Sequence, residues 1–130
     1  MDKKDILEFF KHDIYAMETT GIEILETSKD HAKTRLKIGP KHMNANNTVM
    51  GGCIYTLADF TFALAANTDN NLTCTISSNI IFNSPGKGEY LYAESKVIKS
   101  GRTIASFEIV VTDDQDRLVA TATMVGSRKA

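Results

Sequence analysis

Hydrophobic residues near the start of the chain recur at the spacing of a helix. Between Lys3 and Thr20, most apolar positions fall three or four residues apart, which predicts an amphipathic helix within residues 1–20. These positions are Ile6, Leu7, Phe10, Ile14 and Met17. Gly21 follows as a typical stop signal, so we expect the helix to end before it.

A second stretch, residues 50–67, has a different pattern. Its sequence, MGGCIYTLADFTFALAAN, carries apolar residues around the whole helix axis instead of along one stripe. That pattern is typical of a helix that is buried on all sides. We therefore expect a central helix over residues 50–67.

The rest of the chain has the pattern of strands joined by turns. Apolar and polar residues alternate over residues 72–82, which places Cys74 and Phe82 on one strand face and Thr75 and Asn79 on the other. Clusters of Gly, Pro, Ser and Asp separate the predicted strands. These strands cover residues 22–27, 32–38, 72–82, 90–99, 103–112 and 118–126.

One buried helix among several long antiparallel strands favours an α+β domain in which a curved sheet wraps around the helix. This architecture is the hot-dog fold, here with an extra N-terminal helix. A chain of 130 residues fits one such domain, residues 1–130. The outer strands of the sheet leave open edges that invite pairing between subunits. We therefore expect a homodimer, assembled further into a homotetramer.

Composition and charge narrow the range of functions. The formal net charge is -1 and basic residues are interleaved with acidic ones, which argues against a nucleic-acid partner. Cys53 and Cys74 are too few for a disulfide framework or a cysteine zinc site, and both lie in apolar runs, so we expect two buried free thiols. The sequence shows no signal peptide and no uncharged apolar run of about 20 residues, which favours a cytoplasmic protein without membrane contact.

Asp59 is the residue that points most clearly to chemistry. It is the only formally charged residue between Lys41 and Asp69, and it falls in the middle of the apolar helix. Burying a carboxylate without partners costs several kcal/mol or raises its pKa substantially. Asp59 is therefore either a functional carboxylate or a structural one that caps a loop or pairs across an interface.

Gly51 and Gly52 begin the same helix. Backbone N–H groups at a helix start have no intrahelical partner, and glycines let another group approach them closely. Such donors suit an oxyanion, although two glycines also simply allow a tight entry into a helix. Asp59 lies about 12 Å from Gly51 along one helix. If both groups act on one carbonyl, they must come from different subunits, which again predicts a dimer with shared active sites.

The central segment resembles the signature of the PaaI-type hot-dog thioesterases. The resemblance rests on MNANNTVMGGCIYTLADFTFALAAN, residues 43–67, and extends more loosely to NSPG, KSGRT and LVATATM. These three segments are residues 83–86, 99–103 and 118–124. The resemblance implies a hydrolase that acts on acyl-CoA thioesters and needs no metal or organic cofactor.

The resemblance also implies roles for individual residues. Asp59 matches the catalytic carboxylate, which acts as a nucleophile or as a general base on water. Gly51 and Gly52 match the glycines whose N–H groups polarise the thioester carbonyl. Asn44 matches a loop asparagine that orients water or substrate.

The match fails at Met50, where the family has a histidine. If that imidazole donates directly to the oxyanion, its loss costs on the order of 10²–10³ in rate; if it only fixes the helix start, the loss is small. Thr61 could supply a hydroxyl in its place, or be a buried hydroxyl bonded to its own helix. His42, in the loop before the helix, is a weaker candidate for this role.

The coenzyme end of the substrate is assigned to a glycine turn with two basic residues, Lys99, Ser100, Gly101 and Arg102. Such a turn can bind phosphates through N–H groups and charge, although a solvated hairpin explains the same residues. Residues 127–129 are a weaker candidate of the same kind, expected as a solvated tail.

The remaining candidates concern the acyl end of the substrate and metal binding. We expect the acyl group near Met50 in an apolar tunnel at the subunit interface, with Thr61 and Asn79 as further substrate contacts. His12, His31 and His42 share no metal-ligand spacing and are expected on the surface or in loops, so no metal site is predicted.

Three functions fit this sequence. The first is an acyl-CoA thioesterase that hydrolyses small or medium acyl or aryl thioesters. The second is an acyl-CoA-binding protein of the same fold with reduced catalysis, which the Met50 departure permits. The third and weakest is a dehydratase, because the dehydratases of this fold rely on a histidine that the helix lacks.

Overall fold

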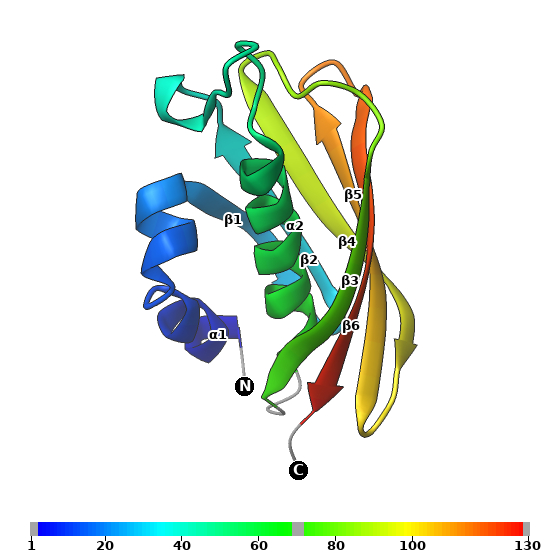
Figure 1. Ribbon diagram of the computed structural model, residues 1–130. Helices are drawn as coiled ribbons and strands as arrows, with labels where there is room; N and C mark the ends of the chain where they lie inside the picture. Colours follow the sequence, from blue (N-terminus) through cyan, green and yellow to red (C-terminus); the bar gives the residue numbers. More distant parts are fainter. Residues whose placement is uncertain (1–2, 69–71, 129–130) are drawn as a thin grey trace.

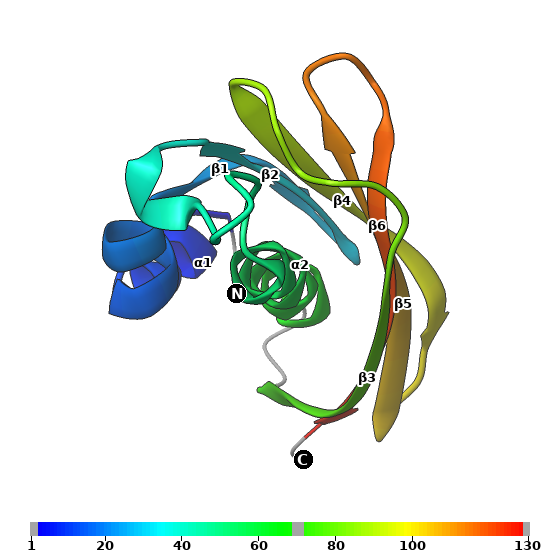
Figure 2. The same cartoon turned by 45° about the horizontal axis from the view of Figure 1, so that its top comes forward.

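The computed structural model describes residues 3–68 and 72–128. Within these residues, six antiparallel strands form one sheet in the order β1-β2-β4-β5-β6-β3. The strands are β1 (Ile22–Ser28), β2 (His31–Lys37), β3 (Thr73–Phe82), β4 (Tyr90–Ser100), β5 (Ile104–Asp113) and β6 (Leu118–Arg128). The sheet curves around helix α2 (Gly51–Ala66), which lies along its concave face (Figures 1 and 2). This is the hot-dog architecture expected from the sequence.

Helix α2 provides one side of the hydrophobic core, and the concave face of the sheet provides the other. Its residues Leu57, Phe62 and Leu64 are fully buried. Gly52, Thr56, Asp59 and Ala63 recur at helical spacing along one stripe that is only partly covered. The expectation that α2 is buried on all sides is therefore wrong for a single chain, because this stripe is left open.

The helix packs close to β6 at Gly126. A Cβ atom at this position would lie 2.8 Å from Cζ of Phe62 and 2.5 Å from Cγ2 of Thr73, both too close for a side chain. The Phe62 ring also contacts the Phe107 ring of β5 edge to face, with centroids 5.7 Å apart. The missing side chain of Gly126 thus lets the central helix pack tightly onto the sheet.

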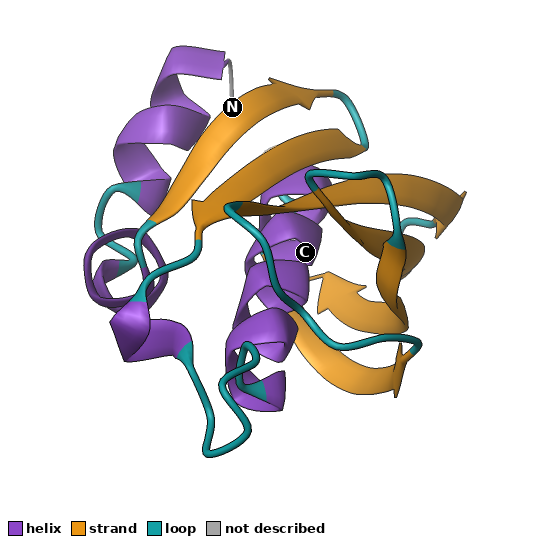
Figure 3. Ribbon diagram, turned by 90° about the horizontal axis from the view of Figure 1, so that it is seen from above, coloured by secondary structure: helices purple, strands orange, loops and turns teal. Residues whose placement is uncertain are grey.

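The N-terminal region forms two helical segments instead of the one predicted helix. Helix α1 (Lys3–Phe10) ends early, and a π-helical segment, η1 (Tyr15–Thr20), follows it. The break occurs at Asp13, because its carboxylate accepts the backbone N–H of Ala16 at 3.2 Å and starts a new helical turn. Gly21, with φ of 86°, ends the second segment as expected. Both segments lie to one side of α2, next to β1 (Figure 3).

Strand β3 differs from the simple alternation predicted for residues 72–82. A β-bulge at Ile76 shifts the register between Thr75 and Ser77. Before the bulge, Thr73 and Thr75 face the helix; after it, Phe82 does, and its ring lies 3.4 Å from the Cβ position of Gly51. The bulge therefore exchanges the two faces halfway along the strand.

Candidate active site

Asp59 lies in the middle of α2, on the partly covered stripe. Its Oδ1 accepts a hydrogen bond from the hydroxyl of Thr75 on β3, at 3.2 Å. Burial raises the pKa of the Asp59 carboxyl and the charge of Asp13 raises it further, whereas the Thr75 hydrogen bond lowers it. The resulting pKa of Asp59 lies above its ordinary value, so this carboxylate has increased basicity. One side of it remains accessible.

Thr75 is a site residue that the sequence did not single out. The predicted strand placed it on the same face as Asn79. In the structure the bulge at Ile76 leaves Thr75 facing α2, and Ser78 takes the helix-facing position after the bulge, where its hydroxyl bonds Tyr55 at 2.8 Å. Asn79 therefore faces away from the helix, so its assignment as a substrate contact in its own chain is wrong.

Gly51 and Gly52 form the first turn of α2, as expected. Met50 is the N-cap residue and makes no side-chain hydrogen bond to the helix start, so no side chain of the cap covers these N–H groups. Met50 is 53% exposed. The first N–H groups of the helix are therefore available to a substrate oxygen at the positive end of the helix dipole.

Two cavities flank this helix start. One, of about 270 Å³, lies beside Gly52 and Met50 and is also lined by Tyr15, Lys41 and Cys53. The other, of about 390 Å³, lies beside Gly51, on the side of the loop that follows β3. The two glycines thus open on different cavities, which suits a substrate with an acyl end and a long coenzyme end.

The loop that precedes the helix is held together by Asn44. Its Oδ1 accepts the backbone N–H groups of Asn46 and Thr48, at 2.9 and 3.1 Å. A bridge between Met43 and Val49 closes the loop. The side-chain oxygen of Asn44 is therefore used within the loop, and its side-chain NH₂ is the group that can contact water or substrate.

His42 is buried, which corrects the expectation of a surface or loop histidine. Its Nδ1 accepts the backbone N–H of Gly39 at 2.9 Å, and its Nε2 lies 2.7 Å from the carbonyl oxygen of Thr20. Because Nδ1 accepts, the proton is on Nε2, which donates to Thr20. Both ring nitrogens are engaged, so His42 cannot replace the imidazole that Met50 lacks.

Thr61 also lies outside the substrate's reach. It is fully buried, and its hydroxyl donates to the carbonyl oxygen of Leu57 at 2.7 Å and contacts the Thr34 hydroxyl at 2.8 Å. Of the two interpretations, the hydroxyl bonded to its own helix backbone is the one the structure shows. Its assignment as a substrate contact is wrong.

The turn formed by Lys99, Ser100, Gly101 and Arg102 joins β4 to β5 at the far end of α2 from Gly51. Ser100 is engaged within the fold: its hydroxyl donates to Asp30 at 3.1 Å and accepts from Arg128 at 2.8 Å. Arg128 in turn donates to the carbonyl oxygen of Ala66, the last residue of α2. Since α2 is about 22 Å long, this turn lies far from Gly51 of the same chain, and its contact with the coenzyme stays a prediction.

Residues 127–129 were expected as a solvated tail, and this is wrong for the part that the structure describes. Ser127 and Arg128 belong to β6, and the Arg128 side chain is 2% exposed. Lys129 lies outside the described residues. Arg128 is a structural residue that closes the C-terminal end of the helix.

The two cysteines are free, as expected, but only one of them is shielded. Cys53 is half-buried beside the Gly52 cavity, and desolvation raises the pKa of its thiol to about 11. Cys74 is exposed on β3, which corrects the expectation of a buried thiol. Cys53 is therefore a poor nucleophile despite its position next to the site.

The fold and the site together define a hot-dog protein whose central helix carries a single carboxylate, Asp59, and begins with N–H groups that no cap side chain covers. The sequence profile of the thioesterase superfamily matches residues 46–120, which is more than half of the 130 residues. The chain therefore belongs to the thioesterase superfamily, and it is a thioester hydrolase that is similar to PaaI.

Individual relatives agree with this assignment. A protein of Archaeoglobus fulgidus named "Putative esterase" is 34% identical over 81% of this chain and 69% of its own. Acyl-coenzyme A thioesterase PaaI of Escherichia coli is 27% identical over 77% of this chain and 72% of its own. The structure of E. coli PaaI superposes with a TM-score of 0.92 and 22% identity, covering 98% of this chain and 92% of that one.

A protein of Streptococcus pneumoniae described as a hypothetical thioesterase and solved with coenzyme A has the same fold, with a TM-score of 0.86 and 21% identity over 93% of this chain and 97% of that one. No described helix of the present protein has the length and apolar character needed to cross a bilayer.

Proposed function

We propose that the protein hydrolyses acyl-CoA thioesters in active sites shared between two subunits. Asp59 of one subunit supplies the carboxylate, and the N–H groups of Gly51 and Gly52 of the other hold the thioester oxygen. The observation that carries the proposal is the hydrogen-bonded carboxylate of Asp59 on the partly covered stripe of a helix that carries no other charge. The CoA-bound structure of the pneumococcal relative supports the choice of thioester.

The proposed reaction needs an ionised carboxylate. Acting as a general base, Asp59 takes a proton from water while the water oxygen attacks the thioester carbon. The negative charge that develops on the carbonyl oxygen is stabilised by the N–H groups at the start of α2. The C–S bond then breaks, and the coenzyme leaves as a thiolate that takes up a proton. If Asp59 attacks the carbon directly instead, the same ionised state is required.

The geometry of one chain argues for sharing. Gly51 and Asp59 belong to the same straight helix and are separated by about 12 Å, too far to act on one carbonyl. The edge strand β3 carries exposed apolar residues, Ile76, Ile81 and Phe82, and an unpaired edge of this kind favours strand pairing between subunits. A two-fold dimer would contain two equal sites.

Two mutants of the pneumococcal relative support the pairing of Asp59 with Thr75. Its structures include an aspartate-to-alanine mutant and a threonine-to-alanine mutant, and the threonine follows the aspartate by sixteen positions. Thr75 follows Asp59 by the same sixteen positions. We infer that the two residues act together here, with Thr75 holding the carboxylate in place.

Mixing two inactive variants tests the shared site. Asp59→Asn removes the charge and keeps the shape. Gly51→Pro removes one N–H donor at the first helical position, where proline is well tolerated, and the extended conformation of Met50 (φ -55°, ψ 135°) suits a following proline. Each variant alone should show little hydrolysis of a panel of acyl and aryl thioesters of CoA.

Subunits of the two variants are then unfolded, mixed in equal amounts and refolded together. Half of the dimers are mixed, and one of the two sites in each is intact, so about a quarter of the wild-type activity should return. Absence of any recovery, with dimers present by light scattering, would contradict the shared site. Full turnover by Asp59→Asn alone would contradict hydrolysis through Asp59, and CoA binding without turnover in the wild type would indicate a binding protein.

A further inference from the structure

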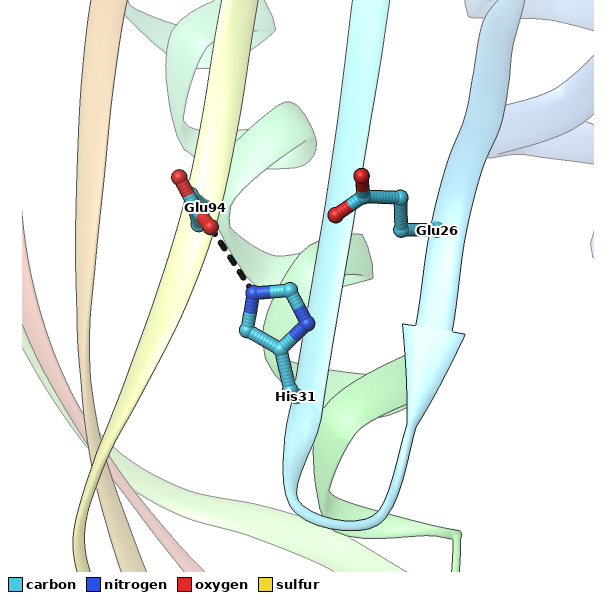
Figure 4. A group of neighbouring side chains, drawn as sticks. All are labelled: Glu26, His31 and Glu94. Atoms are coloured by element: carbon cyan, nitrogen blue, oxygen red, sulfur yellow. Dashed lines mark hydrogen bonds and ion pairs between the residues drawn. The ribbon is translucent and has the colours of Figure 1, made fainter.

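Three ligand-type side chains meet on the outer, convex face of the sheet, away from the proposed active site. Glu26, His31 and Glu94 come from β1, β2 and β4, three neighbouring strands (Figure 4). One donor atom from each lies within 4.8 Å of the other two. None of these residues has a role in the proposed hydrolysis, because α2 and its cavities lie on the opposite face of the sheet.

The distances are close to those of a metal site. Nε2 of His31 lies 2.8 Å from Oε2 of Glu94, and the two glutamates lie on either side of the imidazole ring (Figure 4). Donor atoms around a tetrahedral Zn²⁺ ion at about 2.0–2.2 Å are separated by about 3.3–3.6 Å. Small rotations of two exposed side chains would reach that arrangement. A histidine with two carboxylates is also a donor set that zinc accepts, unlike a group of carboxylates alone.

A β-bulge places Glu26 in this group. In β1, Ile22 and Ile24 face the core, so regular alternation would point residue 26 inward as well. The register shifts between Ile24 and Glu26, and Thr27 becomes the buried residue instead. Glu26 is thereby turned to the outer face, in register with Lys33 of β2. Bulges commonly serve to redirect a functional side chain.

His31 lies where β2 begins to diverge from β4. The ladder between these strands starts at Lys33 and Glu94, and the backbone N–H of Ala32 donates to the side chain of Ser95 at 2.8 Å instead of to the β4 backbone. The imidazole therefore stands beside Glu94 with room around it, and its side chain is 31% exposed. An ion can enter from solvent without unfolding the strand.

Lys33 is the cation that competes with a metal ion here. It lies in register with both glutamates. Its side chain lines an open groove of about 580 Å³ with Tyr92 and residues 113–116. Among the described residues, no ion pair within 4.0 Å involves Lys33. The two carboxylates are thus not already neutralised by direct contact with a lysine.

We propose that Glu26, His31 and Glu94 form a binding site for a divalent transition-metal ion of the Zn²⁺ type. The ion takes the place of the His31–Glu94 hydrogen bond, and water completes its coordination. A bound ion would join β1, β2 and β4 at the end of the sheet where the ladder between β2 and β4 begins.

Titration calorimetry with Zn²⁺ on the untagged, chelator-treated protein tests this site. The Cys74→Ser background removes the exposed thiol as a competing ligand. We expect one ion per chain and no binding at this site in His31→Ala. Glu94→Gln and Glu26→Gln should bind at least about tenfold more weakly, since even mutation of residues that only hydrogen-bond to metal ligands weakens metal binding by this much. His12→Ala and Glu108→Gln are the matched controls and should bind as the parent does.

Two further measurements separate metal binding from a mere change in folding. Lys33→Met should bind zinc several-fold more tightly, because it removes a positive charge beside the ion. In the NMR spectrum of the parent, zinc should shift the His31 ring signals and leave those of His42 unchanged. The proposal fails if the parent does not bind zinc, if His31→Ala binds it equally well, or if the His31 signals do not move.

Discussion

The carboxylate of Asp59 is subject to opposing influences that can be separated by mutation. Burial and the charge of Asp13 raise its pKa, and the hydroxyl of Thr75 lowers it. Burial and the nearby charge thus make Asp59 a stronger base, whereas Thr75 keeps more of it ionised and fixes its orientation. The hydrogen bond of Thr75 is therefore a positioning contact as well as an electrostatic one.

Thr75→Val should expose both effects. Loss of the hydrogen bond raises the pKa of Asp59, so the acidic limb of the pH profile of kcat/KM should move to higher pH. Because the carboxylate is also less well oriented, kcat should fall on the order of 10–100-fold. The matched control is Thr123→Val, on the exposed face of β6. A reduced kcat with an unmoved acidic limb would show that Thr75 does not act through the Asp59 charge.

Single residues were predictable from sequence where their chemistry was isolated. Asp59 stood out because it is one charge in an apolar helix, and the two glycines because they begin that helix. The sequence placed Thr75 and Asn79 on the same strand face, because the bulge that sends them to opposite faces has no clear signal in the alternation of residues 72–82. The burial of His42 and Thr61 depends on partners far away in sequence, Thr20 and Thr34.

The β5–β6 turn is an element held by one side chain. Asp113 is 2% exposed, and its carboxylate accepts the backbone N–H groups of Gln115 and Arg117, both at 2.9 Å. The Arg117 side chain adds a third contact at 2.8 Å. Burial alone would raise the pKa of Asp113, but these donors outweigh it and the pKa lies below the ordinary value.

Asp113→Ala should therefore destabilise the fold by about 1–3 kcal/mol near neutral pH, because the N–H groups of Gln115 and Arg117 lose their acceptor. A group with a lowered pKa stabilises the fold above its ordinary pKa, and this contribution is lost as the pH falls through the lowered value. The difference in free energy of unfolding, measured in urea, should accordingly shrink below about pH 4. Gln115→Ala keeps the backbone donor and should change the free energy of unfolding little. An equal loss of stability in Gln115→Ala would show that the Asp113 carboxylate is not what holds the turn.

At the level of elements, the sequence located every strand to within one or two residues at each end. Alternation and turn residues suffice for this because they act locally. The N-terminal helix was predicted as one piece because its apolar spacing continues through Asp13, whose capping of Ala16 interrupts the helix. Hydrophobic periodicity does not record such side-chain competition with the backbone.

Arg128 connects parts of the molecule that are distant in sequence. Its guanidinium reaches the end of α2 at Ala66, the hydroxyl of Ser100 at the β4–β5 turn, and the carboxylate of Asp30 at 3.9 Å in the β1–β2 turn. Four elements thus meet at one buried cation. Removing a partner from a buried group of this kind leaves the others unsatisfied.

Arg128→Met should lower the free energy of unfolding of the whole protein by about 3 kcal/mol, a typical loss when a buried ion pair is broken. The exposed Arg102, on the neighbouring turn, provides the matched variant Arg102→Met, which should unfold like the wild type. The measurement is the urea midpoint at constant slope. Equal midpoints for the two variants would contradict the structural role of Arg128.

The overall architecture was predictable because a helix with apolar residues on every side, among long strands, has few alternatives to a wrapped sheet. What the sequence could not show is how far one chain covers that helix. The stripe containing Asp59 stays open in a single chain. A sequence pattern records that a position is apolar, and not whether its own chain or a second one covers it.

The strand order has a consequence for how the chain is made. Strand β3 pairs only with β6 within the sheet, and β6 follows it by about 35 residues. At a synthesis rate of roughly 5–20 residues per second, β3 leaves the ribosome a few seconds before its neighbour exists. During that time its exposed isoleucines lack any strand partner in the growing chain. The β4–β5 hairpin can form in this interval, and it is then the template onto which β6, and after it β3, adds.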